Sequence, residues 1–257
     1  MFNKINRYWR IFATGLSFTL FGLGGVLLRI LVFPLLHVLI RDRHRRIIIA
    51  RTIIRLSFRF FIGLMVFLGI LRYQIIGLER LNRSGLLILA NHPTLLDTVF
   101  LMAFVKNAGC IVKHHLRHNP FTHGPVKAAG YIDNEQGTEL VTACINSLQE
   151  GTNLIIFPEG TRTPANGTIE LKRGAANIAV RAGRAVTPVH IQCKPPSLSK
   201  GEPWWQVPER QMRFEIEVKE DIHIEYFTGE GQSDVMAARR LTQYLQDYYI
   251  KECHSHA

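Results

Sequence analysis

A long uncharged apolar run near the N-terminus constrains this chain most. Residues 11–28, IFATGLSFTLFGLGGVLL, carry no charged side chain. Eighteen apolar residues in a helix reach the lower limit of what crosses a bilayer. The run is too long for a signal peptide and no small-residue cleavage site follows it, while a buried helix of a soluble protein is the less favoured alternative. The sequence predicts a membrane-associated region at residues 1–71 and a globular region at residues 72–257.

The rest of the N-terminal region contains two shorter apolar runs that are separated by basic residues. A second run, residues 30–40, is interrupted by Pro34 and His37, and a basic block, RDRHRR, follows at residues 41–46. A third run, residues 60–71, is too short to span a bilayer and predicts an interfacial or re-entrant helix.

Positive charge on both sides of the apolar runs favours an arrangement in which both ends stay in the cytoplasm. The arginines that follow Ile40 are expected against anionic head groups. A helical hairpin with its tip at residues 29–34 fits this pattern, and one tilted span with an external N-terminus is the alternative. We expect the globular region on the cytoplasmic side of a membrane, with a bacterial inner membrane as the favoured location. The flanking basic residues are Lys4, Arg7 and Arg10 before the first run and Arg41, Arg43, Arg45, Arg46, Arg51 and Arg55 after the second.

The net charge of +11 admits anionic lipid, nucleic acid or acidic small molecules as partners. Nucleic acid is not expected, because the arginines cluster beside apolar runs and no nucleic-acid-binding signature is present. The four cysteines have no metal or redox spacing, so they are expected to be reduced thiols.

The globular region alternates short apolar runs with helical patterns. This alternation predicts an α/β fold, a mixed sheet flanked by helices. The Trp204-Trp205 pair lies in a proline-rich loop at residues 195–208, as an interfacial anchor or as ordinary packing residues. The predicted strands cover residues 71–76, 86–90, 110–113, 131–133, 153–157, 186–192 and 212–218, and the predicted helices cover residues 94–106, 138–150, 174–182 and 233–249.

The first chemical motif is Asn91-His92-Pro93-Thr94-Leu95-Leu96-Asp97. His92 follows an apolar strand, and α/β sheets place their chemistry at such carboxyl ends. Imidazole titrates near neutrality and can act as a general base, oriented by Asp97. A structural interpretation stays open, in which Thr94 and Asp97 form a helix-capping box.

The second motif, NLIIFPEGTRT at residues 153–163, also ends a strand in a polar loop. Gly160 permits close approach of a ligand, Thr161 offers a hydroxyl, and Arg162 offers a planar fork for phosphate or carboxylate. Lys172 adds positive charge near a predicted helix start, where anions are favoured. A weak salt bridge between Glu159 and Arg162 within the turn is the structural alternative.

Together these motifs resemble the glycerolipid acyltransferase family that includes 1-acylglycerol-3-phosphate acyltransferases. The resemblance covers residues 73–189 and includes both complete motifs in order. It implies direct acyl transfer in which His92 deprotonates an acceptor hydroxyl and Asp97 orients His92. Acyl-CoA or acyl-carrier protein would be the co-substrate, without a further cofactor, and membrane lipids would be the partners. Glu159, Gly160, Thr161, Arg162 and Lys172 would hold the acceptor head group.

The resemblance leaves the oxyanion donors and the acceptor open. Lys113 is one candidate donor, and backbone amides near the predicted helix start are others. Asn134 stands where the family commonly has an arginine that binds acceptor phosphate. The default acceptor is therefore 1-acylglycerol-3-phosphate, with lyso-ornithine or another specialised lipid as the alternative.

A cluster of histidines after Lys113 is interpreted as a polar rim of a groove rather than as a metal site, because no carboxylate or cysteine completes the ligand set. Three other functions remain: a thioester hydrolase, which would not need the cationic residues, a non-catalytic lipid-binding membrane protein, and a nucleic-acid binder, which rests on charge alone. The clustered histidines are His114, His115, His118 and His123.

Overall fold

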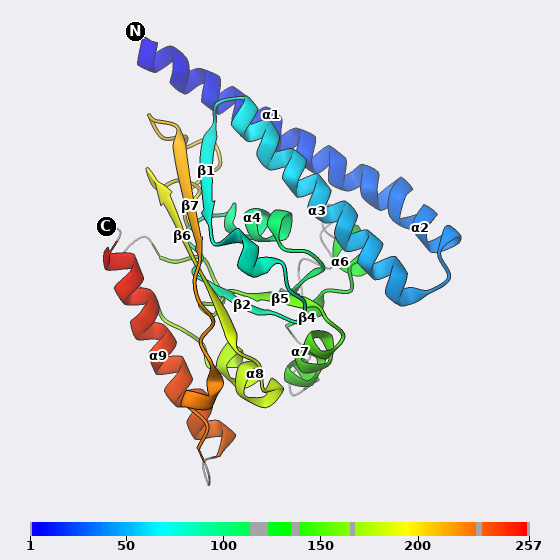
Figure 1. Cartoon of the computed structure of the whole chain (residues 1–257). Coiled ribbons are helices and arrows are strands. Elements are labelled where there is room, and N and C mark those ends of the chain that lie inside the picture. The colour runs from blue at the N-terminus through cyan, green and yellow to red at the C-terminus, as the bar shows by residue number, and fades with distance from the viewer. Residues whose placement is uncertain (1, 114–122, 135–138, 165–167, 230–232, 256–257) are drawn as a thin grey trace.

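The protein folds as a sheet with helices on both faces, and a long helical hairpin lies across one of these helical layers (Figure 1). The computed structural model describes residues 2–113, 123–134, 139–164, 168–229 and 233–255. Its helices are α1 (Phe2–Leu27), α2 (Phe33–Leu39), α3 (Arg43–Phe67), α4 (Asp97–Phe104), α6 (His123–Ala128), α7 (Glu139–Gln149), α8 (Gly174–Ala182) and α9 (Asp234–Ser255). Its strands are β1 (Leu71–Ile76), β2 (Leu87–Ala90), β3 (Ala108–Val112), β4 (Ile132–Asp133), β5 (Asn153–Ile156), β6 (Val186–Lys194) and β7 (Met212–Val218).

The seven strands form one mixed sheet in the order β1-β7-β6-β2-β5-β3-β4. Strands β6, β2, β5, β3 and β4 are parallel to one another, whereas β7 runs antiparallel to β6 and parallel to β1. The predicted mixed α/β fold is therefore confirmed. Strands β1 and β7 and helix α8 have the predicted bounds, while the helix predicted from Thr94 begins three residues later, at Asp97.

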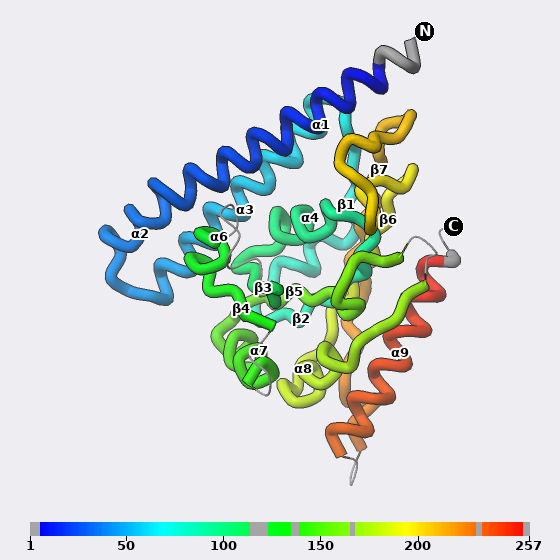
Figure 2. Tube along the Cα trace, turned by 180° about the vertical axis from the view of Figure 1, so that it is seen from behind, coloured from blue at the N-terminus to red at the C-terminus, as the bar shows by residue number. Residues whose placement is uncertain are grey.

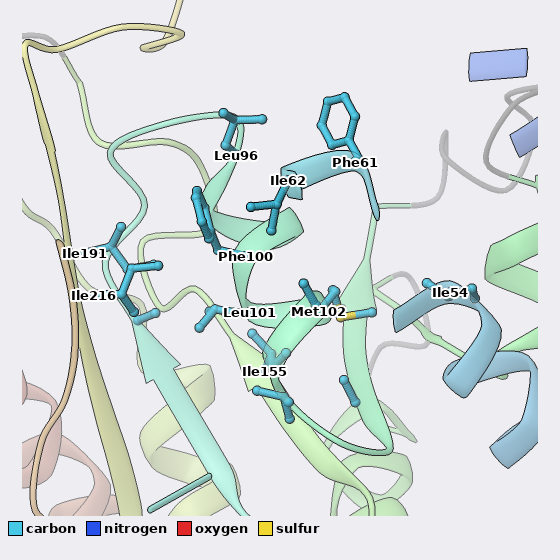
Figure 3. Packing of buried hydrophobic residues seen from close by; sticks show 14 of the residues in the cluster. Ile54, Phe61, Ile62, Leu96, Phe100, Leu101, Met102, Ile155, Ile191 and Ile216 are labelled. Carbon is cyan, nitrogen blue, oxygen red and sulfur yellow. The ribbon is translucent and has the colours of Figure 1, made fainter. Parts of the chain in front are cut away.

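The central strand β2 is buried on both faces. Ile88 and Ala90 join a core with helices α3 and α4, whereas Leu87 and Leu89 join a second core with α7, α8 and α9. Alternate residues of a strand point to opposite faces, so this strand reads as continuously apolar. Figure 3 shows the first core, where Ile62 of α3 points toward Phe100 of α4.

The N-terminal hairpin turns at a different place from the one predicted. Helix α1 continues through a π-helical segment, Leu28–Val32, into α2, and the chain reverses only at residues 40–42. The predicted tip at residues 29–34 is wrong because Pro34 lies in the first turn of α2, where the missing N–H of a proline is tolerated. Asp42 starts the return helix by accepting a hydrogen bond from Arg45 N at 2.6 Å.

Helix α3 packs antiparallel to α1 along this hairpin (Figures 1 and 2). The ring of Phe21 lies 4.6 Å from that of Phe61 and 5.4 Å from that of Phe58. The third apolar run is not a separate short helix, because its residues up to Phe67 are the end of the 25-residue helix α3. The continuous helical segment Asn6–Leu39 is long and apolar enough to cross a membrane.

The prediction that the arginines after Ile40 lie against head groups is wrong for Arg51 of α3, because this residue is buried in the protein. Its guanidinium donates to Ala129 O at 2.9 Å, to Asn107 Oδ1 at 2.8 Å and to Thr152 Oγ1 at 2.9 Å. A buried arginine is tolerated where acceptors surround it. Arg51 thus joins the hairpin to the end of α6 and to the residues that directly precede β3 and β5.

Candidate active site

The two sequence motifs meet because of the strand order. The His92 motif follows β2 and the FPEGTR motif follows β5, and these parallel strands are direct neighbours, with Leu87 opposite Leu154. The carboxyl ends of parallel strands lie at one edge of a sheet. The backbones of the motifs also bond to each other, since Thr163 N donates to His92 O at 2.8 Å.

His92 and Asp97 form a hydrogen-bonded pair. His92 Nδ1 lies 2.9 Å from Asp97 Oδ2, and the carboxylate is fully buried. A carboxylate only accepts hydrogen bonds, so Nδ1 must carry the proton and Nε2 must carry the lone pair. Within the described part of the chain, Nε2 makes no hydrogen bond. The ring therefore has the tautomer that a general base needs.

Asp97 also serves the local backbone. Thr94 N donates to Asp97 Oδ2 at 2.6 Å, and Thr94 Oγ1 donates to Asp97 Oδ1 at 2.6 Å. Burial raises the pKa of Asp97, whereas the bonds from His92 and Thr94 lower it. The structural and chemical interpretations of the motif thus hold together, because one carboxylate organises the turn and orients the histidine.

Two motif residues to which sequence reasoning assigned no role position this pair further. Phe157 stacks on the His92 ring, with 4.1 Å between ring centroids and 22° between planes. Asn91 anchors the loop to β6, where Nδ2 donates to Ile191 O at 2.8 Å and Oδ1 accepts from Ile191 N at 2.7 Å. Both residues lie within the motifs, and an amide directly after a buried strand was the available signal for Asn91.

Glu159 points into the protein and holds the two motifs together. Its Oε1 accepts from His92 N and from Thr163 Oγ1, both at 3.0 Å, and the residue is 5 % exposed. Its Oε2 is buried and makes no hydrogen bond with the described residues. Burial raises the pKa of Glu159, although the two hydrogen bonds oppose the shift. The salt bridge to Arg162, which was the structural alternative for this turn, is absent from the described ion pairs, and the Arg162 guanidinium donates to backbone carbonyls instead.

Two cationic side chains lie beside this turn. Gly160 has a φ of +67°, and a Cβ there would meet Lys172 Nζ at 3.0 Å, so the lysine lies directly over the glycine. Arg162 Nη1 donates to Leu198 O and Ser199 O, both at 2.9 Å. Thr161 is partly exposed in the same turn. An anionic group at this edge would meet the remaining guanidinium donors and the ammonium group.

Three of the backbone amides that are candidate oxyanion donors already have hydrogen-bond partners within the protein. The N–H groups of Thr94, Leu95 and Leu96 donate to Asp97 Oδ2, Leu198 O and Thr94 Oγ1. These three candidate amides are therefore not free to bind an oxyanion. Lys113 is exposed and follows β3, at the same edge of the sheet as the motifs.

The structure describes Asn134, but it describes only one residue of the histidine cluster. Asn134 is exposed and its N–H donates to Val112 O at 3.0 Å. His123 begins α6, whereas His114, His115 and His118 lie outside the described residues. Among the residues that are described, no group of three histidine, cysteine or acidic side chains is arranged to hold a metal ion.

Comparisons with known proteins agree with this arrangement. Residues 72–192 match the family model described as Acyltransferase. A 1-acyl-sn-glycerol-3-phosphate acyltransferase of Pseudomonas aeruginosa is 31% identical over 137 residues, which cover 51% of this chain and 53% of that protein. One of Borreliella burgdorferi is 29% identical over 147 residues, which cover 53% of this chain and 59% of that protein. The chain thus spans little more than half the length of these curated relatives.

The fold has a counterpart among solved structures. The 1-acyl-sn-glycerophosphate acyltransferase of Thermotoga maritima aligns with a TM-score of 0.71 and 21% identity over 98% of this chain and 97% of that one. That alignment includes the N-terminal hairpin as well as the sheet, and it establishes the fold. Residues 72–192 thus match the acyltransferase family over a stretch that contains both motifs and the paired His92 and Asp97.

Proposed function

We propose that this protein transfers a fatty acyl group from an acyl thioester, acyl-CoA or acyl-carrier protein, to a hydroxyl of a lysophospholipid-like acceptor. The observation that carries the proposal is the His92–Asp97 pair at the sheet edge that also presents Arg162 and Lys172. The default acceptor is 1-acylglycerol-3-phosphate, which has a free hydroxyl for the base and a phosphate for the two cations. The names of the relatives support the same acceptor.

The reaction follows from the tautomer of His92. Its Nε2 takes the proton of the acceptor hydroxyl while the hydroxyl oxygen attacks the thioester carbonyl. Asp97 faces the imidazolium that forms and stabilises its charge. The tetrahedral intermediate then expels the thiolate, which takes the proton from His92, so ester and free thiol leave and the histidine returns to its starting state. No covalent enzyme intermediate is needed.

Arg162 and Lys172 favour an acceptor with an anionic head group over water. A hydrolase needs a base but no site for an anion, so the two cations argue for transfer to a charged lipid. Asn134 replaces one expected phosphate contact, which keeps a lyso-ornithine or other specialised acceptor as the alternative. A lipid-binding protein without catalysis would have no use for the Asp97–His92 pair.

We further propose that the hairpin lies in the membrane interface rather than across the bilayer. Arg10 donates to Pro208 O at 3.3 Å and also to Glu209 O, and a Cβ on Gly124 would lie 2.7 Å from Arg29 Cβ. The globular region therefore contacts the helix at both Arg10 and Arg29. At a rise of 1.5 Å per residue these positions are about 28 Å apart, which is close to the thickness of the hydrocarbon core. A spanning helix would draw one of these two segments, the β6–β7 loop or α6, into lipid.

The acceptor is tested with purified full-length protein in lipid vesicles. Labelled acyl-CoA and acyl-carrier protein are each offered with 1-acylglycerol-3-phosphate, with a neutral monoacylglycerol of equal chain length, and with a lyso-ornithine lipid. The proposal expects esterification of an anionic or zwitterionic lysolipid. Release of free fatty acid at the same rate with and without acceptor would overturn it in favour of a hydrolase.

The role of Arg162 has its own test. Arg162→Ala should raise the KM of the acceptor by about tenfold to a hundredfold, which corresponds to the loss of one charge-assisted interaction. The KM of the acyl donor should change little. Arg184→Ala, which removes an exposed arginine at the opposite edge of the sheet, is the matched control. An equal rise in both KM values of Arg162→Ala would contradict the role.

A further inference from the structure

The loop between β6 and β7 presents two adjacent tryptophans to the outside. Trp204 is 43% exposed and Trp205 is 57% exposed, and their rings pack edge to face with 5.6 Å between centroids. Tryptophan is highly buried on average in soluble proteins, so two adjacent exposed indoles need an explanation. Ordinary packing was the alternative interpretation of this pair. It explains the buried part of each side chain, which is smaller for Trp205 than for Trp204, but not the exposed part.

The tryptophans continue the exposed apolar face of α1. A Cβ on Gly15 would lie 3.0 Å from the Trp204 ring, so this helix has a glycine where the indole crosses it. Ile11, Phe12, Leu16 and Thr19 line a shallow groove of about 430 Å³ with Trp204. Figures 1 and 2 both place the loop before β7 beside the first half of α1. One apolar surface therefore extends from the long helix onto the globular region.

We propose that Trp204 and Trp205 anchor the β6–β7 loop in the head-group region of a phospholipid bilayer. Indole has a large apolar body and one N–H donor, and it prefers the boundary between hydrocarbon and water. The helix beside the loop is the one with the length and composition of a membrane segment. Exposed Arg7, Lys200 and Arg210 lie on the helix and the loop, where they complement anionic head groups.

The same loop holds the site. The carbonyls of Leu198 and Ser199 accept from Arg162 Nη1, and Leu198 O also accepts from Leu95 N in the His92 motif. Ser199 N in turn donates a hydrogen bond to Glu202 Oε2 at 2.9 Å, and Glu202 lies only two residues before Trp204. The anchor thus sets Arg162 at the depth of lipid head groups. This second step rests on the proposed acyl transfer, whereas the membrane contact itself does not.

Membrane contact is tested by fluorescence of the full-length protein reconstituted in anionic vesicles. In a Trp9→Phe background, Trp204→Phe and Trp205→Phe are used separately, so that each variant keeps one loop tryptophan. We expect a blue-shifted emission, a several-fold loss of acrylamide quenching, and quenching by lipids brominated near the head group. The control is Tyr226→Trp in a background with all three native tryptophans replaced by phenylalanine. Tyr226 is 77% exposed and lies near the amino end of β6, away from the loop.

The control tryptophan should stay water-accessible. Loop tryptophans that are quenched by acrylamide as strongly as this control, and not by brominated lipids, would overturn the membrane contact. That outcome is decided without any activity measurement, so failure of the proposed acyl transfer is recognised separately, by absence of product in wild type.

Coupling to Arg162 is tested by kinetics on two forms of acceptor. The double variant Trp204→Ala/Trp205→Ala should raise the KM several-fold for a lysolipid embedded in vesicles and leave that of a short-chain, water-soluble analogue unchanged. Trp204→Phe/Trp205→Phe should retain a lower KM on vesicles than the alanine pair. An equal rise for both acceptors would show a loop that matters only for folding, and would overturn the coupling.

Discussion

Replacing Asp97 by asparagine separates the charge of this residue from its geometry. Oδ2 of Asp97 accepts from both His92 Nδ1 and Thr94 N, while Oδ1 faces Thr94 Oγ1. An asparagine oxygen in the Oδ2 position keeps both of its donors, and its NH₂ group can donate to the Thr94 hydroxyl, which also accepts. The neighbouring Thr94 N–H thus selects the amide orientation that preserves the His92 tautomer.

The expected loss is therefore mainly the loss of one charge. Two unit charges about 4 Å apart interact by about 4 kcal/mol at an effective dielectric constant of about 20. Because the proton is only partly transferred in the transition state, we expect kcat of Asp97→Asn to fall by about 10²- to 10³-fold. Asp97→Ala should lose more, since His92 is no longer oriented and Thr94 N is left buried without a partner, which also destabilises the fold by about 1–3 kcal/mol.

The assay measures initial rates of labelled acyl transfer at saturating donor and acceptor, with the melting temperature of each variant as a folding control. Asp97→Asn should melt close to wild type and Asp97→Ala clearly below it. If both variants lose the same activity, the tautomer argument from Thr94 is wrong. If Asp97→Asn retains the wild-type rate, the carboxylate charge has no part in the reaction.

Three further predictions concern the turn and the hairpin. Gly160→Ala should raise the acceptor KM by displacing Lys172, whereas Gly183→Ala, which has the same left-handed backbone at φ +58° but nothing within 4 Å, should only lose about 1 kcal/mol of stability; equal KM values would contradict this. The raised pKa of Glu159 means that the folded protein binds its proton more tightly than the unfolded chain, so its contribution to stability falls as pH rises above the ordinary value of 4.5. The melting temperature of Glu159→Gln minus that of wild type should therefore grow between pH 4.5 and 7, and a constant difference would refute the sign. Arg51→Met leaves three acceptors unpaired and should lower the unfolding free energy in urea by about 2–4 kcal/mol, while an unchanged midpoint would show that the burial is unimportant.

The sequence allowed the site edge to be predicted because it depends on local patterns. Two apolar strands in the sequence each end in a polar motif. When such strands are parallel neighbours in a sheet, their carboxyl ends lie side by side. The His92–Asp97 pair follows from that placement and from a helix that starts nearby. Its distance of 2.9 Å and the shared use of Asp97 by Thr94 required the structure.

Other features depend on contacts between distant segments, which no local pattern reports. Arg51 sits in a basic, apolar stretch like its neighbours, but its acceptors come from residues 107, 129 and 152. Glu159 directly precedes Gly160, Thr161 and Arg162, which are exposed or partly exposed, and only the approach of His92 N reveals that its carboxylate turns inward. The hairpin turn at residues 40–42 was misplaced because a proline was taken as a break, although it occupies the first turn of a helix.

The proposed acyl transfer requires His92 to act as the base. The most direct measurement compares wild type and His92→Ala, purified at full length in vesicles, for transfer of labelled acyl groups from acyl-CoA or acyl-carrier protein to 1-acylglycerol-3-phosphate. We predict that the variant binds the acceptor with wild-type affinity and forms product at least about 10³-fold more slowly. Product formation by His92→Ala at a rate near that of wild type would contradict the mechanism.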